Sequence, residues 1–364
     1  MLDYFKVPEK DIVVVKEVDL KKTTEDMFKF CGVNPKEAEI AADVLIHADL
    51  RAIETHGVSN LMRMYMQGFK DGKHKAKPDW KIIRESATTA TIDGDKGHGL
   101  IITHHAMNIA IQKAEEFGMG AVSIRNSGHC GAVGYFAMMA LEHDMIGTCM
   151  TAGGNTMVPT FGAEARLGTN PISIAVPTDK KPPFVFDAAT TTIAGNKMGL
   201  LERIGATMQP GWVTHDDGTP DMDGGAEFEY MNGPQKMQLP LGGTRELGSH
   251  KGYGLGVSVD ILCGILSSGN GFKTLSADRR AHYVSAYKVD AFNDVDEFKQ
   301  SMDQMLQGLE DTKPAPGHNR VLYAGLEEHE EEKRRKINGI PLHREVVEWY
   351  EGACKEMKIE FSWR

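Results

Sequence analysis

One stretch of the chain, AVSIRNSGHCGAVGYFAMMALEHDMIGTCMTA (residues 121–152), contains a predicted strand, helix and strand in succession. Short apolar runs at 120–125 and 145–152 predict the two strands, and the apolar segment 134–145 predicts the helix between them. The turn that joins the first strand to the helix is rich in glycine and contains His129. Alternating strands and helices indicate an α/β fold.

The same alternation continues on both sides of this unit. Runs at 87–94, 171–177 and 184–190 predict further strands, and the segment 104–118 predicts another helix. Residues 249–269 are apolar nearly all round, which predicts a buried helix. We therefore expect a mixed sheet covered by helices.

A dinucleotide-binding fingerprint is missing from this pattern. No GxGxxG follows a strand and opens a helix, and the partial match GYGLGV follows His250 and Lys251 rather than a strand. We expect no Rossmann domain.

Both ends of the chain are predicted to be helical. Residues 23–75 contain one helix with Asn34 as its N-cap and a second helix near 59–68. The charged residues 327–336 are typical of a solvated helix face.

The length of 364 residues suggests about two domains. We expect residues 1–78 to form a helical segment that packs with residues 300–364, and residues 79–299 to form the α/β region.

The composition excludes several classes of protein. A net charge of -10 argues against a nucleic-acid partner, which would favour a basic surface. No apolar run is long enough to span a membrane, and no signal peptide is evident. The five scattered cysteines form no CxxC pair and indicate reduced thiols, so a cytoplasmic location is expected.

Two histidines stand beside glycines in predicted turns. His129 follows the strand 120–125, where neighbouring glycines would leave room for a small ligand. His56 lies between two predicted helices, where Thr55 either caps the second helix or hydrogen-bonds the imidazole. A histidine near its usual pKa suits acid–base chemistry, and the alternative is a structural histidine bonded to backbone.

Two charged residues extend this set. Asp187 ends a predicted strand and either accepts hydrogen bonds from a ligand or caps the next helix. Lys251 lies beside glycines and either neutralises a phosphate or carboxylate or is a surface residue. The histidines keep no metal-ligand spacing, so we expect no metal site.

Several blocks of the sequence resemble the malate/L-lactate dehydrogenase family that is distinct from the Rossmann-type lactate and malate dehydrogenases. The blocks run in order over roughly residues 40–330 and include ETHGVSNLMRMYMQG, FGAEARLGTNPISIAVPT, FVFDAATTTIAGNKM, LPLGG and HKGYGLGVSVDILCGILSSG. The resemblance implies a non-Rossmann fold, a nicotinamide cofactor (NAD or NADP), and a homodimer. It places cofactor and substrate in the region 79–299.

The resemblance also implies site residues. His56 and His129 are the implied catalytic residues, with His56 favoured as the acid–base. The implied substrate-binding residues are Thr55, Asn60 and Lys251. The implied cofactor-binding residues are Asp187, Ala188, Ala189, Thr190, Thr191, Lys251, Gly252, Ala324, Gly325 and Leu326.

This chain departs from the family pattern at some of these positions. Thr55 replaces a serine, Gly128 replaces an asparagine, and Ala324 and Leu326 depart from the usual contact segment. Asn60 replaces an arginine that is suited to a substrate carboxylate. Either the substrate differs, or another cation binds the carboxylate, with Arg63, Arg51 and Lys251 as candidates.

The function that these features predict is hydride transfer between a nicotinamide cofactor and a small 2-hydroxy acid or 2-oxo acid, with malate and oxaloacetate favoured. The alternatives are reduction of a cyclic imine or of another 2-oxo acid, of the lactate, sulfolactate or ureidoglycolate type. A non-catalytic ligand-binding relative is the alternative from a different class.

Overall fold

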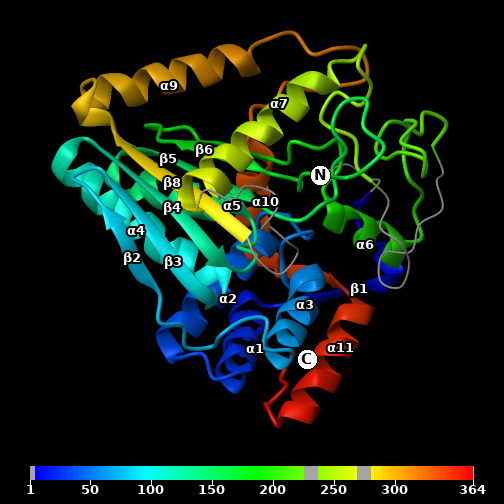
Figure 1. Cartoon of the computed structure of the whole chain (residues 1–364). Helices are drawn as coiled ribbons and strands as arrows, with labels where there is room; N and C mark the ends of the chain where they lie inside the picture. Colours follow the sequence, from blue (N-terminus) through cyan, green and yellow to red (C-terminus); the bar gives the residue numbers. More distant parts are fainter. Residues whose placement is uncertain (1–4, 225–236, 269–279, 364) are drawn as a thin grey trace.

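A seven-stranded sheet forms the centre of the molecule (Figure 1). The structure, a computed structural model, describes residues 5–224, 237–268 and 280–363. The strands β3 and β4 are parallel and all other neighbours in the sheet are antiparallel, which confirms the predicted mixed sheet. The strand order is β2 (Lys81–Glu85), β3 (Thr89–Gly97), β4 (Met119–Ser127), β8 (Arg280–Lys288), β5 (Met145–Ala152), β6 (Ile172–Val176) and β7 (Phe184–Ala188).

The central strand β8 was not predicted from the sequence. It comes late in the chain and lies between β4 and β5, pairing with both. Two of its buried residues are polar and bond within the sheet. His282 Nδ1 lies 2.8 Å from Thr151 Oγ1, and Ser285 Oγ lies 2.6 Å from Thr148 Oγ1. These hydrogen bonds let a strand without an apolar run occupy the middle of the sheet.

Helices cover both faces of the sheet. Val284 and Ala286 of β8 face the core beneath α4 (Gly99–Phe117) and α5 (Val133–Met139). Ala281 and Tyr283, on the opposite face, pack against α7 (Ser249–Asp260) and the π-helical turn Ile261–Ile265 that continues it into α8 (Leu266–Ser268). The alternation follows from the period of two along a strand.

The predicted buried helix at 249–269 is only half buried. Its outer side leaves four large apolar residues 45–57% exposed, namely Leu255, Ile261, Ile265 and Leu266. The sequence pattern predicted the helix but not the exposure of its outer side, because an apolar pattern does not show which sides of a helix are covered. Gly269, the last residue of the predicted helix, lies outside the described residues.

The two ends of the chain pack together. A two-stranded sheet pairs β1 (Ile12–Val15) with β9 (Ile340–His343), and Thr24 of α1 (Glu17–Phe30) lies 3.1 Å from the hydroxyl of Tyr350 in α11 (Arg344–Met357). Asn34 caps α2 (Pro35–Leu50) as predicted, since its Oδ1 accepts a hydrogen bond from the Glu37 amide at 3.0 Å. The second predicted helix is α3 (Val58–Lys70). The boundaries at 78 and 300 stay a prediction.

Three more α-helices complete the described chain, beside short 3-10 helices at Glu9–Asp11, Ala140–His143 and Val289–Ala291. These α-helices are α6 (Gly195–Ile204), α9 (Val295–Glu310) and α10 (Leu326–Asn338). The charged stretch 327–336 lies in α10 and is not simply a solvated face. Arg335 is buried, donates to the Asp49 carbonyl at 2.6 Å and pairs with Glu54. Long-range partners thus bury charges that look solvated in the sequence.

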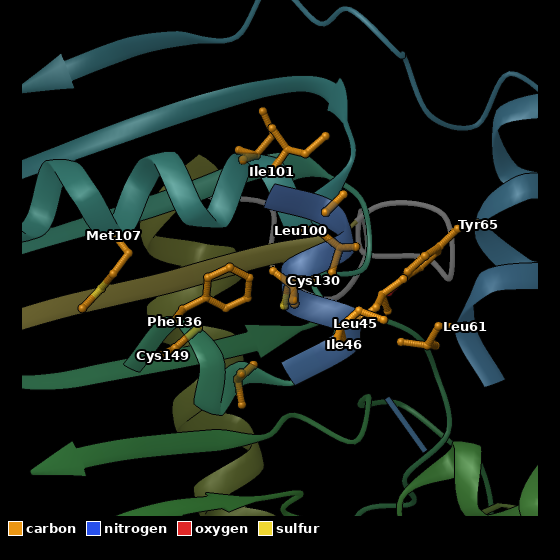
Figure 2. Packing of buried hydrophobic residues seen from close by; sticks show 14 of the residues in the cluster. Leu45, Ile46, Leu61, Tyr65, Leu100, Ile101, Met107, Cys130, Phe136 and Cys149 are labelled. Carbon is orange, nitrogen blue, oxygen red and sulfur yellow. The ribbon is translucent and has the colours of Figure 1, made fainter. Parts of the chain in front are cut away.

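One hydrophobic cluster joins the terminal helices to the sheet (Figure 2). Leu45 of α2, Tyr65 of α3, Leu100 of α4 and Phe136 of α5 are fully buried in it. The cluster fixes the break between α2 and α3 beside the turn between β4 and α5. These two segments carry His56 and His129.

Candidate active site

The turn between α2 and α3 is held by a buried carboxyl group. Asp49 Oδ2 accepts a hydrogen bond from the Val58 amide at 2.8 Å, and so takes the part of a cap for α3. A Cβ on Gly57 would overlap the Asp49 carboxylate, so only glycine fits there. Thr55 Oγ1 lies 2.9 Å from Nδ1 of His56. Of the two predicted alternatives for Thr55, the structure shows the bond to the imidazole.

Two of the glycines around His129 allow neighbouring segments to pack closely. A Cβ on Gly128 would lie 2.8 Å from the ring of His74, and one on Gly134 would lie 2.8 Å from the Asp187 carboxylate. Gly131 and Gly134 also line the cavity described below, so the expectation that these glycines leave room for a ligand stays a prediction.

His129 is held in one tautomer by two donors. Its Nδ1 accepts a hydrogen bond from the Gly131 amide at 3.2 Å and lies 2.8 Å from the Tyr65 hydroxyl. Since an amide can only donate, Nδ1 carries no hydrogen, and the ring hydrogen is on Nε2. His129 therefore presents an N–H donor on the side away from Tyr65.

The imidazoles of His56 and His129 lie nearly parallel, with ring centroids 5.8 Å apart and an interplanar angle of 13°. Burial, together with the positive charges of Arg280 and Lys197, lowers the pKa of His56 to about 4. Burial, with Arg280 as the next cause, holds the pKa of His129 well below its usual value. Both rings are neutral at pH 7.

Asp187, at the end of β7, caps a helix that precedes it in the chain. Its Oδ2 accepts a hydrogen bond from the Gly134 amide in the first turn of α5 at 2.7 Å. The prediction that Asp187 caps the next helix in the chain is therefore wrong, because it caps α5 and not α6. Burial raises the pKa of Asp187 to about 6, although the Gly134 bond opposes the shift.

A cavity of about 510 Å³ opens beside these groups. A hydrogen bond of 3.0 Å from the Val185 amide to the Ala324 carbonyl holds the segment at 324 against β7. Segments far apart in the sequence therefore share one wall. The predicted site residues that line the cavity are Thr55, His56, Asp187, Ala188, Ala189, Thr191, Ala324 and Gly325.

Other predicted residues, His129 among them, do not line this cavity. Thr190 and Leu326 are buried beside it, and Thr190 donates to the Thr169 carbonyl at 3.1 Å. Lys251 is exposed at the start of α7, and Gly252 packs against the backbone of Leu241.

Asn60 faces the protein interior. Its Nδ2 donates to the Asn196 carbonyl at 3.1 Å, and its Oδ1 accepts from Arg203 at 3.0 Å. Two of the candidate replacement cations are paired: Arg51 donates to Glu332 at 2.9 Å, and Arg63 forms an ion pair with Glu345.

Three residues near the site were missed by the sequence reasoning. Lys197 of α6 lines the cavity, Tyr65 bonds to His129, and the charge of Arg280 acts on both histidines. Lys197 stands in the block FVFDAATTTIAGNKM, so its position near Asp187 was a usable signal. Tyr65 and Arg280 reach the site only through tertiary packing, and no local pattern marks them.

Within the described residues, no group of three His, Cys, Asp or Glu side chains is placed to hold a metal ion. No helix in the same part of the chain is long and apolar enough to cross a membrane.

Comparisons with known proteins agree on one family. The profile of the family described as malate/L-lactate dehydrogenase matches residues 15–350. Malate dehydrogenase of Pyrococcus abyssi is 39% identical over 323 residues, which is 87% of each chain. L-sulfolactate dehydrogenase of Methanocaldococcus jannaschii is 33% identical over 356 residues, which is 96% of this chain and 99% of that one.

Two solved structures share the whole fold. Malate dehydrogenase from Pyrococcus horikoshii OT3 superposes with a TM-score of 0.87 at 34% identity, covering 98% of both chains. Malate dehydrogenase from Entamoeba histolytica gives a TM-score of 0.89 at 31% identity, covering 96% of this chain and 99% of that one.

Proposed function

Because the chain belongs to the malate/L-lactate dehydrogenase family and is an oxidoreductase of 2-hydroxy acids, we propose that it interconverts malate and oxaloacetate. The observation that carries the proposal is the pair of parallel imidazoles, in which His56 lines the cavity and the ring of His129 lies 5.8 Å from that of His56, together with relatives named malate dehydrogenase at 38–39% identity. Membership of an enzyme family argues against a non-catalytic ligand-binding protein.

The cavity fits a nicotinamide cofactor. Its volume of about 510 Å³ lies within the range of roughly 300–1,000 Å³ that is usual for small-molecule sites. Small side chains at Ala188, Ala189 and Ala324 leave the backbone accessible along two walls. Asp187–Thr191 and Ala324–Leu326 would hold the cofactor, which is NAD or NADP and supplies the hydride acceptor or donor when bound. Lys251 and Gly252 stay predictions of the resemblance.

The proposed roles of the two histidines follow from their hydrogen bonds. We assign the hydrogen between Thr55 Oγ1 and His56 Nδ1 to the imidazole, so that Thr55 accepts and the lone pair of Nε2 is left to take the hydroxyl proton of a 2-hydroxy acid. His129 donates its Nε2–H to the substrate oxygen on which negative charge develops. In the reverse direction His56 returns the proton.

A panel assay tests this proposal. The purified protein is mixed with NADH or NADPH and with oxaloacetate, pyruvate, sulfopyruvate or a cyclic imine 2-carboxylate, and loss of nicotinamide absorbance is followed. We expect oxaloacetate to give the highest kcat/KM. A cyclic imine reduced faster than every oxo acid would replace the proposal with the imine reductase, and a faster sulfopyruvate would make this a sulfolactate dehydrogenase.

We also propose that the working form is a homodimer. The half-exposed apolar side of α7 and its π-helical continuation supports this proposal, because large apolar patches mark interaction surfaces. A second copy is the partner that the family resemblance indicates. The cytoplasmic location stays a prediction from the cysteines, all five of which are unpaired.

A further inference from the structure

The cavity contains a cation that has no carboxylate partner among the residues the structure describes. The Lys and Arg side chains that line it are Arg51 and Lys197, and Arg51 is already paired with Glu332. The Nζ of Lys197 lies 4.5 Å from the centre of the Phe5 ring. Within the described parts of the chain, no carboxylate lies within ion-pair distance of this ammonium group.

A half-buried ammonium group without an anion is costly. Burial lowers the pKa of Lys197 below its usual value, which shows that its surroundings disfavour the charge. The ring of Phe5 offsets only part of that cost, since cation–π contacts contribute about 0.5–2 kcal/mol. An anionic ligand in the cavity would complete the environment of Lys197.

The position of Lys197 is fixed relative to His56. The side-chain amide of Asn196 donates to the Thr55 carbonyl at 2.9 Å, which ties the first turn of α6 to the turn that carries His56. Asn60 Nδ2 donates to the Asn196 carbonyl at 3.1 Å. Asn60 therefore supports the backbone beside Lys197 and does not itself reach the cavity. The positive charge of Lys197 acts on His56.

We propose that Lys197 binds the carboxylate of the 2-oxo or 2-hydroxy acid, and so takes the role that the family resemblance gives to an arginine at the position of Asn60. The inference rests on the proposed function and adds to it a residue that recognises the substrate. It makes a carboxylate next to the reacting carbon a requirement for efficient turnover.

The test compares charged and neutral substrates. Lys197→Met keeps the apolar stem and removes the charge, and Lys197→Arg keeps the charge. The control is Lys36→Met, at an exposed lysine in the first turn of α2. For each variant, kcat and KM are measured with pyruvate and with its uncharged amide, and the Kd of malonate is measured by calorimetry with cofactor present.

We expect Lys197→Met to lower kcat/KM for pyruvate by about 10- to 150-fold, the factor for one hydrogen bond to a charged group. Most of the loss should be in KM, malonate should bind more weakly by a similar factor, and the amide should change by less than about threefold. Lys197→Arg should recover most of the loss, and Lys36→Met should match the wild type.

Equal losses with pyruvate and its amide, or unchanged malonate binding, would overturn the inference. If Lys197→Met does not fold, as judged by its melting curve, the same comparison is made with Lys197→Gln and Lys197→Arg. A wild-type enzyme that reduces no 2-oxo acid contradicts the proposed function. If the wild type reduces 2-oxo acids and Lys197→Met still prefers pyruvate over its amide as strongly as the wild type does, only the assignment of Lys197 is contradicted.

Discussion

At the scale of single residues, the hydrogen bond from Tyr65 selects how His129 acts. Tyr65 lies nine residues after His56, on the buried side of α3, and extends into the core (Figure 2). Its hydroxyl and the Gly131 amide both meet Nδ1 of His129, so the opposite nitrogen must be the donor. The tyrosine is fully buried and does not line the cavity, so it is a positioning residue for His129.

Removing the Tyr65 hydroxyl should weaken the preference of His129 for the tautomer with its hydrogen on Nε2, without disturbing the core. We expect Tyr65→Phe to lower kcat by about 3- to 10-fold, the factor for one hydrogen bond, because the Gly131 amide still restrains His129. The KM for the cofactor should stay the same. The control is Tyr287→Phe on β8. A Tyr65→Phe variant with wild-type kcat and unchanged melting temperature would show that the bond has no role in turnover.

The two histidines should differ when each is replaced by glutamine. Losing an acid–base group typically lowers the rate by about 10²–10⁴-fold, so we expect His56→Gln to lose that much in kcat. His129→Gln should lose less, since glutamine can still donate a hydrogen bond. Cofactor binding, followed by nicotinamide fluorescence, should survive in both. Near-normal turnover in both variants would show that neither histidine is the acid–base group.

At the scale of elements, the junction of α2 and α3 depends on a protonated carboxyl group. Burial raises the pKa of Asp49 to about 8, and the bond from the Val58 amide only partly opposes this. In the unfolded chain the pKa would be about 3.9. Between these values the unfolded chain releases a proton that the folded chain keeps, so Asp49 makes the free energy of unfolding fall as pH rises from about 4 to 8.

Asp49→Asn should remove this pH dependence, because asparagine keeps an acceptor for the Val58 amide and has no proton to lose in this range. Urea unfolding at several pH values measures the effect. The expected result is a flatter stability curve than that of the wild type between pH 4 and 8. Asp71→Asn, at the exposed end of α3, is the control and should leave the slope unchanged. Parallel curves for the wild type and Asp49→Asn would mean that Asp49 is ionised in the folded protein.

At the scale of the whole molecule, the apolar side of α7 and its continuation bears on assembly. Ile265 is 48% exposed there, and we expect Ile265→Glu to convert a dimer into a monomer, since a buried charge at an interface is costly. Ile337 on α10 is 83% exposed outside this patch, and Ile337→Glu should leave the mass unchanged. Light scattering gives both masses. A wild type that is monomeric and fully active at assay concentrations would contradict the homodimer.

Local patterns predicted those parts of the fold that depend on local physics. The strand at 145–152 follows from its apolar run, and the start of α2 follows from Asn34. The strand β8 did not follow, because hydrogen bonds made only in the sheet compensate its buried polar residues. The prediction that α7 is buried was wrong for a similar reason, since burial depends on which other segments cover the helix.

The candidate site divides in the same way. Asp187 stands at the end of a predicted strand and His56 in a predicted turn, and both line the cavity. Arg203 meets Asn60 across 143 positions of sequence and Tyr65 meets His129 across 64, so neither contact leaves a local signature. The place of Lys197 beside His56 likewise required the fold.

The late position of β8 in the chain has a consequence for synthesis. When residues 1–200 have left the ribosome, β4 and β5 exist, but the strand that joins them has not yet been translated. Two strand edges with unpaired amides and carbonyls stay open during that interval, and such edges readily pair with other chains. The sheet closes only after the ribosome has passed Lys288, through contacts of long sequence separation that form slowly. Nascent chains truncated before residue 280 should therefore be the ones that chaperones capture.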